Sequence, residues 1–202
     1  MDDPAGVTFR HGESAITGYS GQSGVFAHGL FGTDWADFVV PVTGYNAESK
    51  EFTLGYAPKY GLKVDGRFYL EGAKEFVNSD GEYAVGEESG TVILYLDSTP
   101  LTVEIARSPG ILMGEGIAGL SISNITFDGV RGTALRLTGD NITLDNVIIR
   151  NTGLNAVDLI GNQNSIRNAK IYNIGASGVE ISGGDRKLLT ASNSSIKDSE
   201  IY

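Results

Sequence analysis

The last third of the chain repeats with a period of about 22 residues, and a fixed period in this range indicates one supersecondary unit stacked on copies of itself. Asn124, Asn146 and Asn168 are spaced by that interval, and apolar residues around them recur with it. We call a set of residues at the same place in successive units a ladder. The ladders are Ile122, Leu144 and Ile166; Ile125, Val147 and Ala169; Phe127, Ile149 and Ile171; Leu135, Val157 and Val179; Leu137, Leu159 and Ile181; and the turn glycines Gly139, Gly161 and Gly183.

Each unit is expected to consist of short strands. Apolar and polar residues alternate within it, as at residues 142–145 and 157–159, and this period of two is typical of a strand with one buried face. No window between residues 117 and 202 has helical periodicity. The sequence therefore predicts an all-β fold, a right-handed parallel β-helix with three strands and about 22 residues per coil. A leucine-rich repeat has a similar length, but its leucine-spaced consensus and helical back are missing.

The recurring asparagines are interpreted as structural residues. They stand where one strand bends into the next, and asparagine tolerates the backbone angles of a sharp turn. Stacked amides can also hydrogen-bond from one coil to the next.

A fourth coil begins near Ser195, with Asp198 at the asparagine position, and the step from Asn168 to Asp198 is longer than the repeat. The extra eight residues lie near residues 183–190, and the sequence stops at Tyr202, partway through that coil. An uncovered β-helix end presents strand edges and an apolar core. We therefore expect a fragment of a longer protein, whose remaining chain or another copy covers the open C-terminal coil.

Composition narrows the classes of function. The 202 residues carry a formal net charge of −10, which disfavours nucleic acid as a partner because phosphates repel an acidic surface. The absence of cysteine excludes disulfides and thiolate chemistry. The start after Met1 has no basic and apolar leader, and no apolar run approaches roughly 20 residues, so we expect no signal peptide and no membrane span. We expect no cofactor or metal, and an extracellular or periplasmic parent protein.

Residues 1–110 are expected to form a small β-rich module, and residues 111–202 the coils. Strand-like runs lie at residues 37–42, 51–54, 91–96 and 101–105, and residues 44–50 are expected to form a hairpin loop. A helical candidate spans Phe68 to Val77. A solenoid needs a cap on its terminal repeat, and this module is a candidate for that role.

A resemblance to known proteins lies in this module. The segment from His28 to Asp37, with the sequence HGLFGTDWAD, resembles the His-Gly…Trp-Ala-Asp segment of a large group of bacterial right-handed β-helix proteins of the pectate-lyase-like superfamily. The similarity continues at residues 66–71, 81–83 and 90–95 and resumes at residues 183–186. Ala84 departs from the family's usual pair of aromatic residues, and the proline-rich end of the strand at 91–96 is missing. These proteins are related to polysaccharide lyases and glycoside hydrolases, so the resemblance implies a carbohydrate-active protein with a polysaccharide or oligosaccharide as partner.

The first candidate site is a charge ladder of Arg136, Asp158 and Glu180, which lie one repeat apart at outward strand positions. Successive strands lie about 4.8 Å apart, so these side chains are expected to be neighbours on one exposed face. Glycosidases use two carboxyl groups roughly 5–10 Å apart. Asp158 and Glu180 are therefore catalytic candidates, and Arg136 is a substrate-binding candidate. The alternative is a solvated face of mixed charge.

The second candidate is the eight-residue excursion. Loops that leave a solenoid on one face often form its binding groove. Asp185 is a candidate acid or base, and Arg186 a candidate group for neutralising a sugar carboxylate. The alternative is an Asp–Arg pair that fixes the loop.

The third candidate is the cluster of His28, Trp35, Asp34 and Asp37. A histidine with two carboxylates can bind a metal, and a tryptophan offers a surface for sugar stacking. We take His28 and Trp35 as substrate-binding candidates. The alternative is that both lie in the core or at a domain interface.

Together with the resemblance, these features favour a carbohydrate-active β-helix protein. Glycoside hydrolysis by a carboxylate pair is the first mechanism considered, and lyase chemistry is second because it usually needs a basic residue at the α-proton. A non-catalytic glycan-binding or cell-surface adhesin solenoid and an inactive fragment of a longer enzyme are the alternatives.

Overall fold

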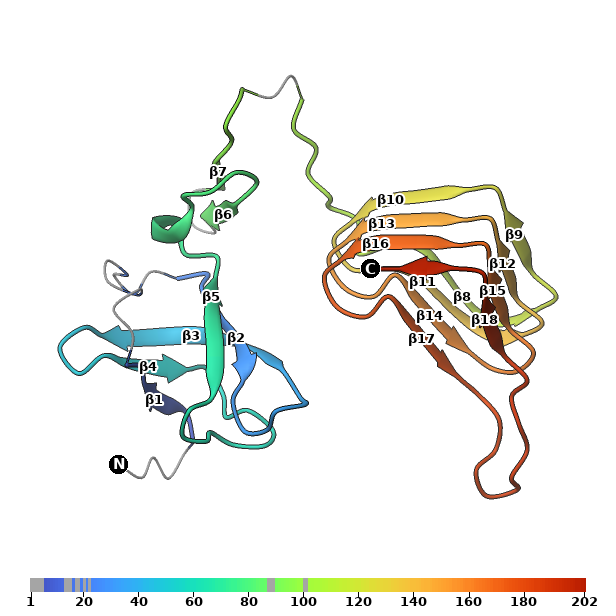
Figure 1. The fold of residues 1–202 in the computed structure, drawn as a ribbon, viewed down its shortest axis with the longest axis horizontal. Coiled ribbons are helices and arrows are strands. Elements are labelled where there is room, and N and C mark those ends of the chain that lie inside the picture. The colour runs from blue at the N-terminus through green and yellow to red at the C-terminus, as the bar shows by residue number, and fades with distance from the viewer. Residues whose placement is uncertain are drawn as a thin grey trace. The chain divides into compact units, whose positions relative to one another are not determined.

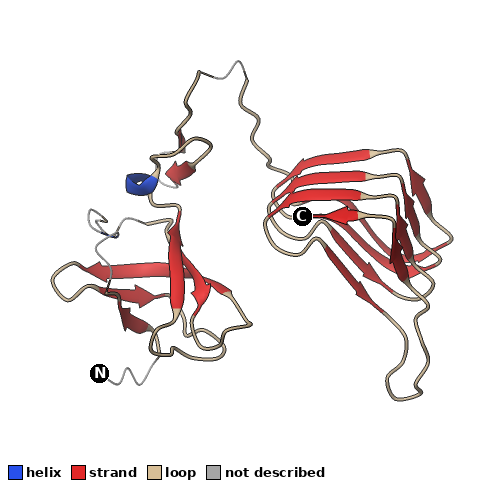
Figure 2. Ribbon diagram, viewed as in Figure 1, coloured by secondary structure: helices blue, strands red, loops and turns tan. Residues whose placement is uncertain are grey.

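The computed structural model describes residues 6–12, 16, 19, 21, 23–86, 90–99 and 102–202. The chain forms two compact units, residues 1–101 and residues 102–202. Within the described residues, strands account for nearly all of the regular structure, and η2 (Lys74–Phe76) is a short 3-10 helix (Figure 2).

The N-terminal unit is built on an antiparallel sheet with strand order β1-β4-β3-β2-β5 (Figure 1). Its strands are β1 (Thr8–Arg10), β2 (Phe26–Leu30), β3 (Phe38–Asn46), β4 (Glu51–Leu54) and β5 (Arg67–Glu71). A separate hairpin joins β6 (Tyr83–Gly86) and β7 (Thr91–Leu94). Aromatic rings fill the core of the sheet: Phe9 lies 5.4 Å from Phe52 and 4.8 Å from Phe68 between ring centroids.

Three local expectations for this half of the sequence are corrected. The helix expected from Phe68 to Val77 is wrong, because residues 67–71 pair with β2 as strand β5 and only residues 74–76 are helical. Of the strand expected at residues 101–105, the described residues 102–105 belong to no strand. The hairpin loop is shorter than expected, since residues 44–46 still belong to β3.

The C-terminal unit is a parallel β-helix with three sheets. Their strand orders are β17-β14-β11-β8, β18-β15-β12-β9 and β10-β13-β16-β19, and all pairs are parallel. The strands are β8 (Gly110–Ala118), β9 (Ser121–Ser123), β10 (Thr126–Val130), β11 (Thr133–Asp140), β12 (Thr143–Asp145), β13 (Ile148–Thr152), β14 (Val157–Ile160), β15 (Ser165–Arg167), β16 (Lys170–Ile174), β17 (Val179–Ser182), β18 (Ser195–Lys197) and β19 (Glu200–Ile201). Figure 1 shows the strands of each sheet lying side by side, one per coil.

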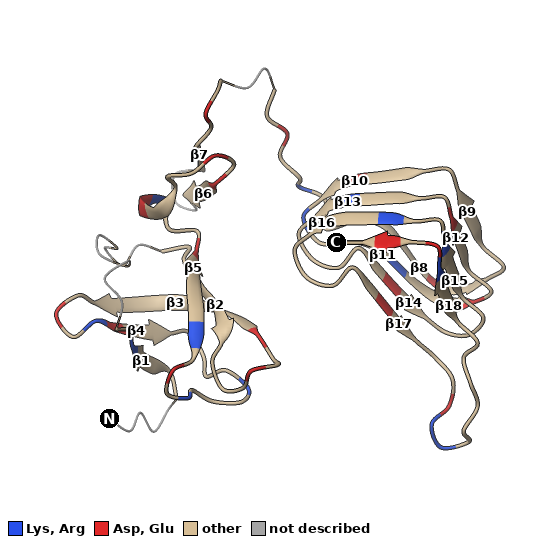
Figure 3. Ribbon diagram, in the orientation of Figure 1, with Lys and Arg blue, Asp and Glu red and all other residues tan. Residues whose placement is uncertain are grey.

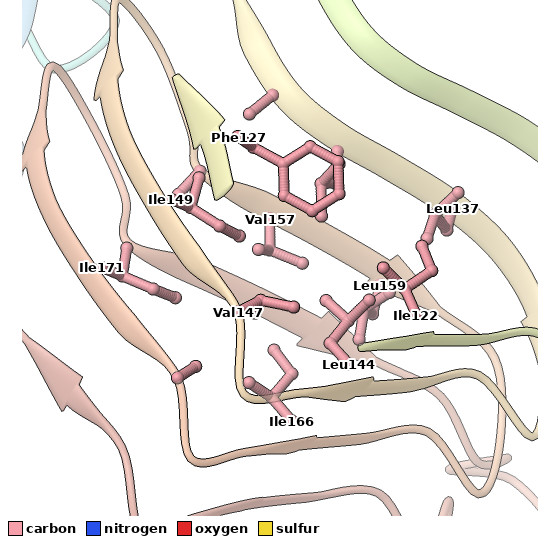
Figure 4. Packing of buried hydrophobic residues seen from close by; sticks show 14 of the residues in the cluster. Ile122, Phe127, Leu137, Leu144, Val147, Ile149, Val157, Leu159, Ile166 and Ile171 are labelled. Atoms are coloured by element: carbon pink, nitrogen blue, oxygen red, sulfur yellow. The ribbon is translucent and has the colours of Figure 1, made fainter. Parts of the chain in front are cut away.

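The apolar ladders form the core of this β-helix. Leu144 is fully buried and lies in register with Ile122 of the coil before and Ile166 of the coil after. The labelled side chains of Figure 4 point into the space between the sheets in the same way. Ile125 is the exception at 46% exposure, because it lies beside the edge strand β10. The expected ladders and the expected all-β fold, with its repeat of about 22 residues per coil, are confirmed.

The coil corners explain the recurring asparagines. Asn124, Asn146 and Asn168 have φ angles of 59°, 50° and 52°, in the left-handed region that asparagine and glycine tolerate best. Asn146 Nδ2 donates to Asn124 Oδ1 at 2.7 Å, as expected for stacked amides. Asn168 instead donates to Asp145 at 2.9 Å. Two further left-handed corner ladders were not anticipated: Gly119, Asn141, Gln163 and Asn193, and Gly129, Asn151 and Asn173.

The turn glycines and one buried amide shape the remaining corner. A Cβ atom at Gly161 would lie 2.1 Å from the carbonyl oxygen of Gly139, and one at Gly183 would lie 2.0 Å from that of Gly161. Only glycine lets successive coils approach this closely. Asn164 is fully buried beside this corner, where its Oδ1 accepts from the Ile142 amide at 2.9 Å and its Nδ2 donates to the Gly139 carbonyl at 3.0 Å.

Candidate functional site

The charge ladder lies on the sheet of β11, β14 and β17, where the charged positions follow one another from coil to coil (Figure 3). Asp158 is in register with Arg136 on one side and Glu180 on the other. Arg136 donates from Nε to Asp158 Oδ2 at 3.0 Å, and its Nη2 lies 2.9 Å from the same oxygen. Asn155 Nδ2 donates to Asp158 Oδ1 at 2.7 Å. The expectation of an exposed face is wrong at Asp158, whose side chain is only 9% exposed with both oxygens bonded.

The other two sheets carry equivalent ion pairs between successive coils. On β10 and β13, Arg150 donates from Nε to Asp128 at 2.7 Å, and on β12 and β15, Arg167 lies 3.1 Å from Asp145. Two hydrogen bonds lower the pKa of Asp128, and the one from Asn151 has a larger effect than the one from Arg150. Bonds from Asn168 and then Arg167 lower the pKa of Asp145 in the same way.

Each face of the β-helix therefore has one Arg–Asp pair that joins neighbouring coils in register. A shift of the register would place like charges or unpaired charges together, which is unfavourable. This recurrence gives the pair of Arg136 and Asp158 a structural role.

Glu180 differs from Asp158. Its side chain is exposed, and it has no hydrogen-bond or ion-pair partner among the described residues. Asp158 is its register neighbour on the adjacent strand, and adjacent strands lie about 4.8 Å apart. The ladder thus offers one carboxylate that is buried and bonded to Arg136 and Asn155, and one that is open to solvent.

The excursion after β17 is an ordered hairpin loop. Asp185 and Thr190 exchange two backbone hydrogen bonds of 3.0 Å. Asp185 Oδ1 also accepts from the amides of Lys187 and Leu188 at 2.7 and 3.1 Å. Arg186 is exposed in the same loop. Asp185 therefore fixes the loop through its carboxylate and its backbone, which both bond to backbone groups of the loop, rather than through the Asp–Arg pair considered from the sequence.

Trp35 lies in an exposed loop of the N-terminal unit, between β2 and β3. Its side chain is 73% exposed, and its ring lies 5.2 Å from that of Tyr60 at an angle of 54°. The backbone at Gly32 packs closely against the backbone of Tyr60, because a Cβ atom added at Gly32 would lie 2.2 Å from the Tyr60 carbonyl oxygen. This contact supports the pair of Trp35 and Tyr60. Asp34 forms an ion pair with Lys63, which anchors the loop on its other side. We call the exposed pair of Trp35 and Tyr60 the aromatic platform.

His28 connects this loop to strand β5. Its Nε2 lies 2.8 Å from Asp37 Oδ2, and its Nδ1 lies 2.8 Å from Glu71 Oε1 and 2.7 Å from the Tyr69 hydroxyl. Burial alone would lower the pKa of His28, but the hydrogen bonds to Asp37 and Glu71 outweigh it and raise that pKa. The bond from His28 lowers the pKa of Asp37. Burial is the largest cause of the raised pKa of Tyr69, and a hydrogen bond to Glu71 raises that pKa further.

Neither His28 nor Trp35 belongs to the buried core. No group of three His, Asp or Glu side chains in the described parts of the chain has a geometry that could hold a metal ion. Sequence reasoning missed Tyr60, Tyr69 and Glu71. They come from segments 25 to 43 residues away from Trp35 or His28, and no local spacing links them.

A family model described as a right-handed beta helix region matches residues 102–202. Searches of curated proteins and of solved structures found no match. Within the residues that the structure describes, no helix is long and apolar enough to cross a membrane.

Proposed function

We propose that this chain, which belongs to the right-handed β-helix family, binds a polysaccharide through the aromatic platform of Trp35 and Tyr60. The observation that supports this proposal is the exposure of the Trp35 side chain, 73%, beside a second exposed ring. Large apolar surface left in water is unfavourable, and aromatic groups held this way mark binding sites.

The surroundings of the platform suit a sugar. A pyranose presents an apolar face of C–H groups and an edge of hydroxyls, so it needs an aromatic surface with hydrogen-bonding groups close by. Lys59 lies over the Tyr60 ring at 5.4 Å, and the ion pair of Lys63 and Asp34 flanks the loop. These groups can donate to and accept from hydroxyls. The resemblance of residues 28–37 to carbohydrate-active β-helix proteins supports the same class of ligand.

The test is retention on insoluble polysaccharides, followed by calorimetric titration with the soluble ligand that corresponds to the best one. We expect Trp35→Ala to weaken binding about tenfold or more, the loss typical of a central aromatic contact. Tyr83→Ala is the matched control, because Tyr83 is also exposed, at 64%, but lies in the separate β6–β7 hairpin. Equal losses in the two variants, or no loss in Trp35→Ala, would contradict the proposal.

A second candidate is glycoside hydrolysis on the β-helix, favoured by the register that makes Asp158 and Glu180 immediate neighbours. In such a reaction Asp158, paired with Arg136, would serve as nucleophile or base, and the exposed Glu180 would serve as the general acid. Asp158 already gives both oxygens to Arg136 and Asn155, so we rank this candidate below binding.

A further inference from the structure

We propose that His28 is a positioning residue that holds the loop of Trp35 in its binding conformation only while its imidazole ring is protonated. The inference rests on the proposed binding role of Trp35 and adds to it a dependence on pH. It is carried by the contacts of one ring with groups from two different segments.

The two carboxylate contacts of His28 are both satisfied only when both ring nitrogens carry a proton. Nδ1 and Nε2 each lie 2.8 Å from a carboxylate oxygen, of Glu71 and Asp37 respectively. A neutral imidazole has one N–H and one lone pair, so one of these contacts would place a lone pair against an anion. An imidazolium donates to both carboxylates.

Among the residues that the structure describes, three titratable groups face this ring. Asp37 comes from the loop before β3, and Glu71 and Tyr69 come from β5. The neighbour of His28 on β3 is Val39, which carries no charge. The ring is therefore governed by two carboxylates and one phenol, and both carboxylates favour its protonated form.

Asp37 transmits the state of His28 to the platform. It follows Trp35 by two residues. Directly before Asp37, the Ala36 amide donates to Thr33 Oγ1 at 3.2 Å and closes a turn that contains Trp35. The loop is also attached by the packing of Gly32 on the Tyr60 backbone, by the ring contact of Trp35 with Tyr60, and by two contacts of Lys63, whose amide donates to the Phe31 carbonyl at 2.8 Å and whose side chain pairs with Asp34. Among these attachments, the bond from His28 to Asp37 is the one whose charge changes near neutral pH.

The sign of the effect follows from the raised pKa of His28. Below that pKa the imidazolium binds Asp37, and the loop is held. As pH rises through that pKa, the ring loses one proton and can then donate to only one of the two carboxylates, so His28 keeps its bond to Asp37 only in the molecules whose remaining N–H is on Nε2. Sugar affinity should therefore be higher in mild acid than in mild alkali.

The composition allows a direct test, because the chain has one tryptophan and two histidines. The fluorescence anisotropy of Trp35 reports the mobility of the loop, and NMR of the imidazole nitrogens reports the protonation of His28, both without any ligand. We expect the anisotropy to fall as pH rises from 5 to 9, with a midpoint that coincides with the titration of His28 and lies above 6.5.

Matched variants separate the contacts. Asp37→Asn and His28→Gln should remove the pH-dependent step. Asp37 has a 67% exposed side chain, so its replacement leaves the folded core untouched. Asp34→Asn should loosen the loop at every pH and keep the step. An anisotropy that is flat in the wild type, that follows His11 instead, or that keeps its step in Asp37→Asn would overturn the proposal.

Binding measurements then distinguish this inference from the proposed function. For the polysaccharide that binds best, we expect an affinity about threefold higher at pH 5.5 than at pH 8.5, the size expected for a largely exposed ion pair, and no such ratio in His28→Gln. Binding that does not change with pH would overturn the role of His28 and leave the platform intact. Absence of all sugar binding would overturn the proposed function, while the anisotropy would still decide the role of His28.

Discussion

Asp158→Asn tests whether the charge ladder stabilises the β-helix or serves catalysis. In the wild type, three donor groups from Arg136 and Asn155 point at the two carboxylate oxygens. An amide replaces one oxygen with an NH₂ group, so a donor must face a donor on one side or the other. The residue is only 7% exposed, and water therefore cannot replace the lost partner.

The expected cost follows from these contacts. Hydrogen bonds to a charged group contribute about 1.5–3 kcal/mol net. The Arg136 side chain is 58% exposed, so solvent recovers part of its share. We expect Asp158→Asn to lower the free energy of unfolding by about 1–2 kcal/mol. In a unit of roughly 100 residues this corresponds to a fall in melting temperature of about 4 °C or more.

Thermal unfolding by circular dichroism gives the change for the whole chain, and hydrogen exchange at β11 and β14 assigns it to the β-helix. Glu180→Gln is the control, because Glu180 is exposed on the next strand, and its change should stay within about 0.5 kcal/mol. In a double-mutant cycle, Arg136→Gln should couple to Asp158→Asn but not to Glu180→Gln. An Asp158→Asn protein as stable as the wild type would refute the structural role of this carboxylate.

Two further predictions concern the β-helix. Leu144→Ala should lower the free energy of unfolding by about 2–5 kcal/mol, because Leu144 is fully buried between two neighbours of its ladder. Ile148→Ala should lower it less, because Ile148 is 37% exposed, and urea unfolding measures both changes. Asp185→Ala should release the loop after β17, since it removes the acceptor of two loop amides, and limited trypsin digestion should then cleave at Arg186 or Lys187 several-fold faster with the overall fold retained. Unchanged digestion would contradict the role of Asp185.

The β-helix could be predicted because its contacts are periodic. Residues one repeat apart are neighbours in space, so one interval in the sequence places Leu144 on Ile122 and Asp158 on Arg136. The same interval relates Asp128 to Arg150 and Asp145 to Arg167, and it could have revealed the ion pairs on the other two faces. Taken without those two ion pairs, the ladder of Arg136, Asp158 and Glu180 suggests a catalytic site.

The N-terminal unit could be predicted only in outline because its contacts are not periodic. His28 and Glu71 lie 43 residues apart and meet because β5 pairs with β2, a long-range pairing that no local pattern indicates. The same pairing explains the wrong helix at residues 68–77, whose local pattern is overruled by the sheet. Trp35 and His28 were identified as site candidates by their side-chain chemistry, whereas Tyr60 and Tyr69 required the fold.

The most direct measurement incubates the wild type, Trp35→Ala and Glu180→Gln with a panel of polysaccharides, and records both retained protein and released reducing ends. We predict retention that Trp35→Ala abolishes and Glu180→Gln leaves unchanged, with no reducing ends released by any of the three proteins. Reducing ends that disappear in Glu180→Gln, together with retention that survives in Trp35→Ala, would contradict binding at the aromatic platform and place the function on the charge ladder.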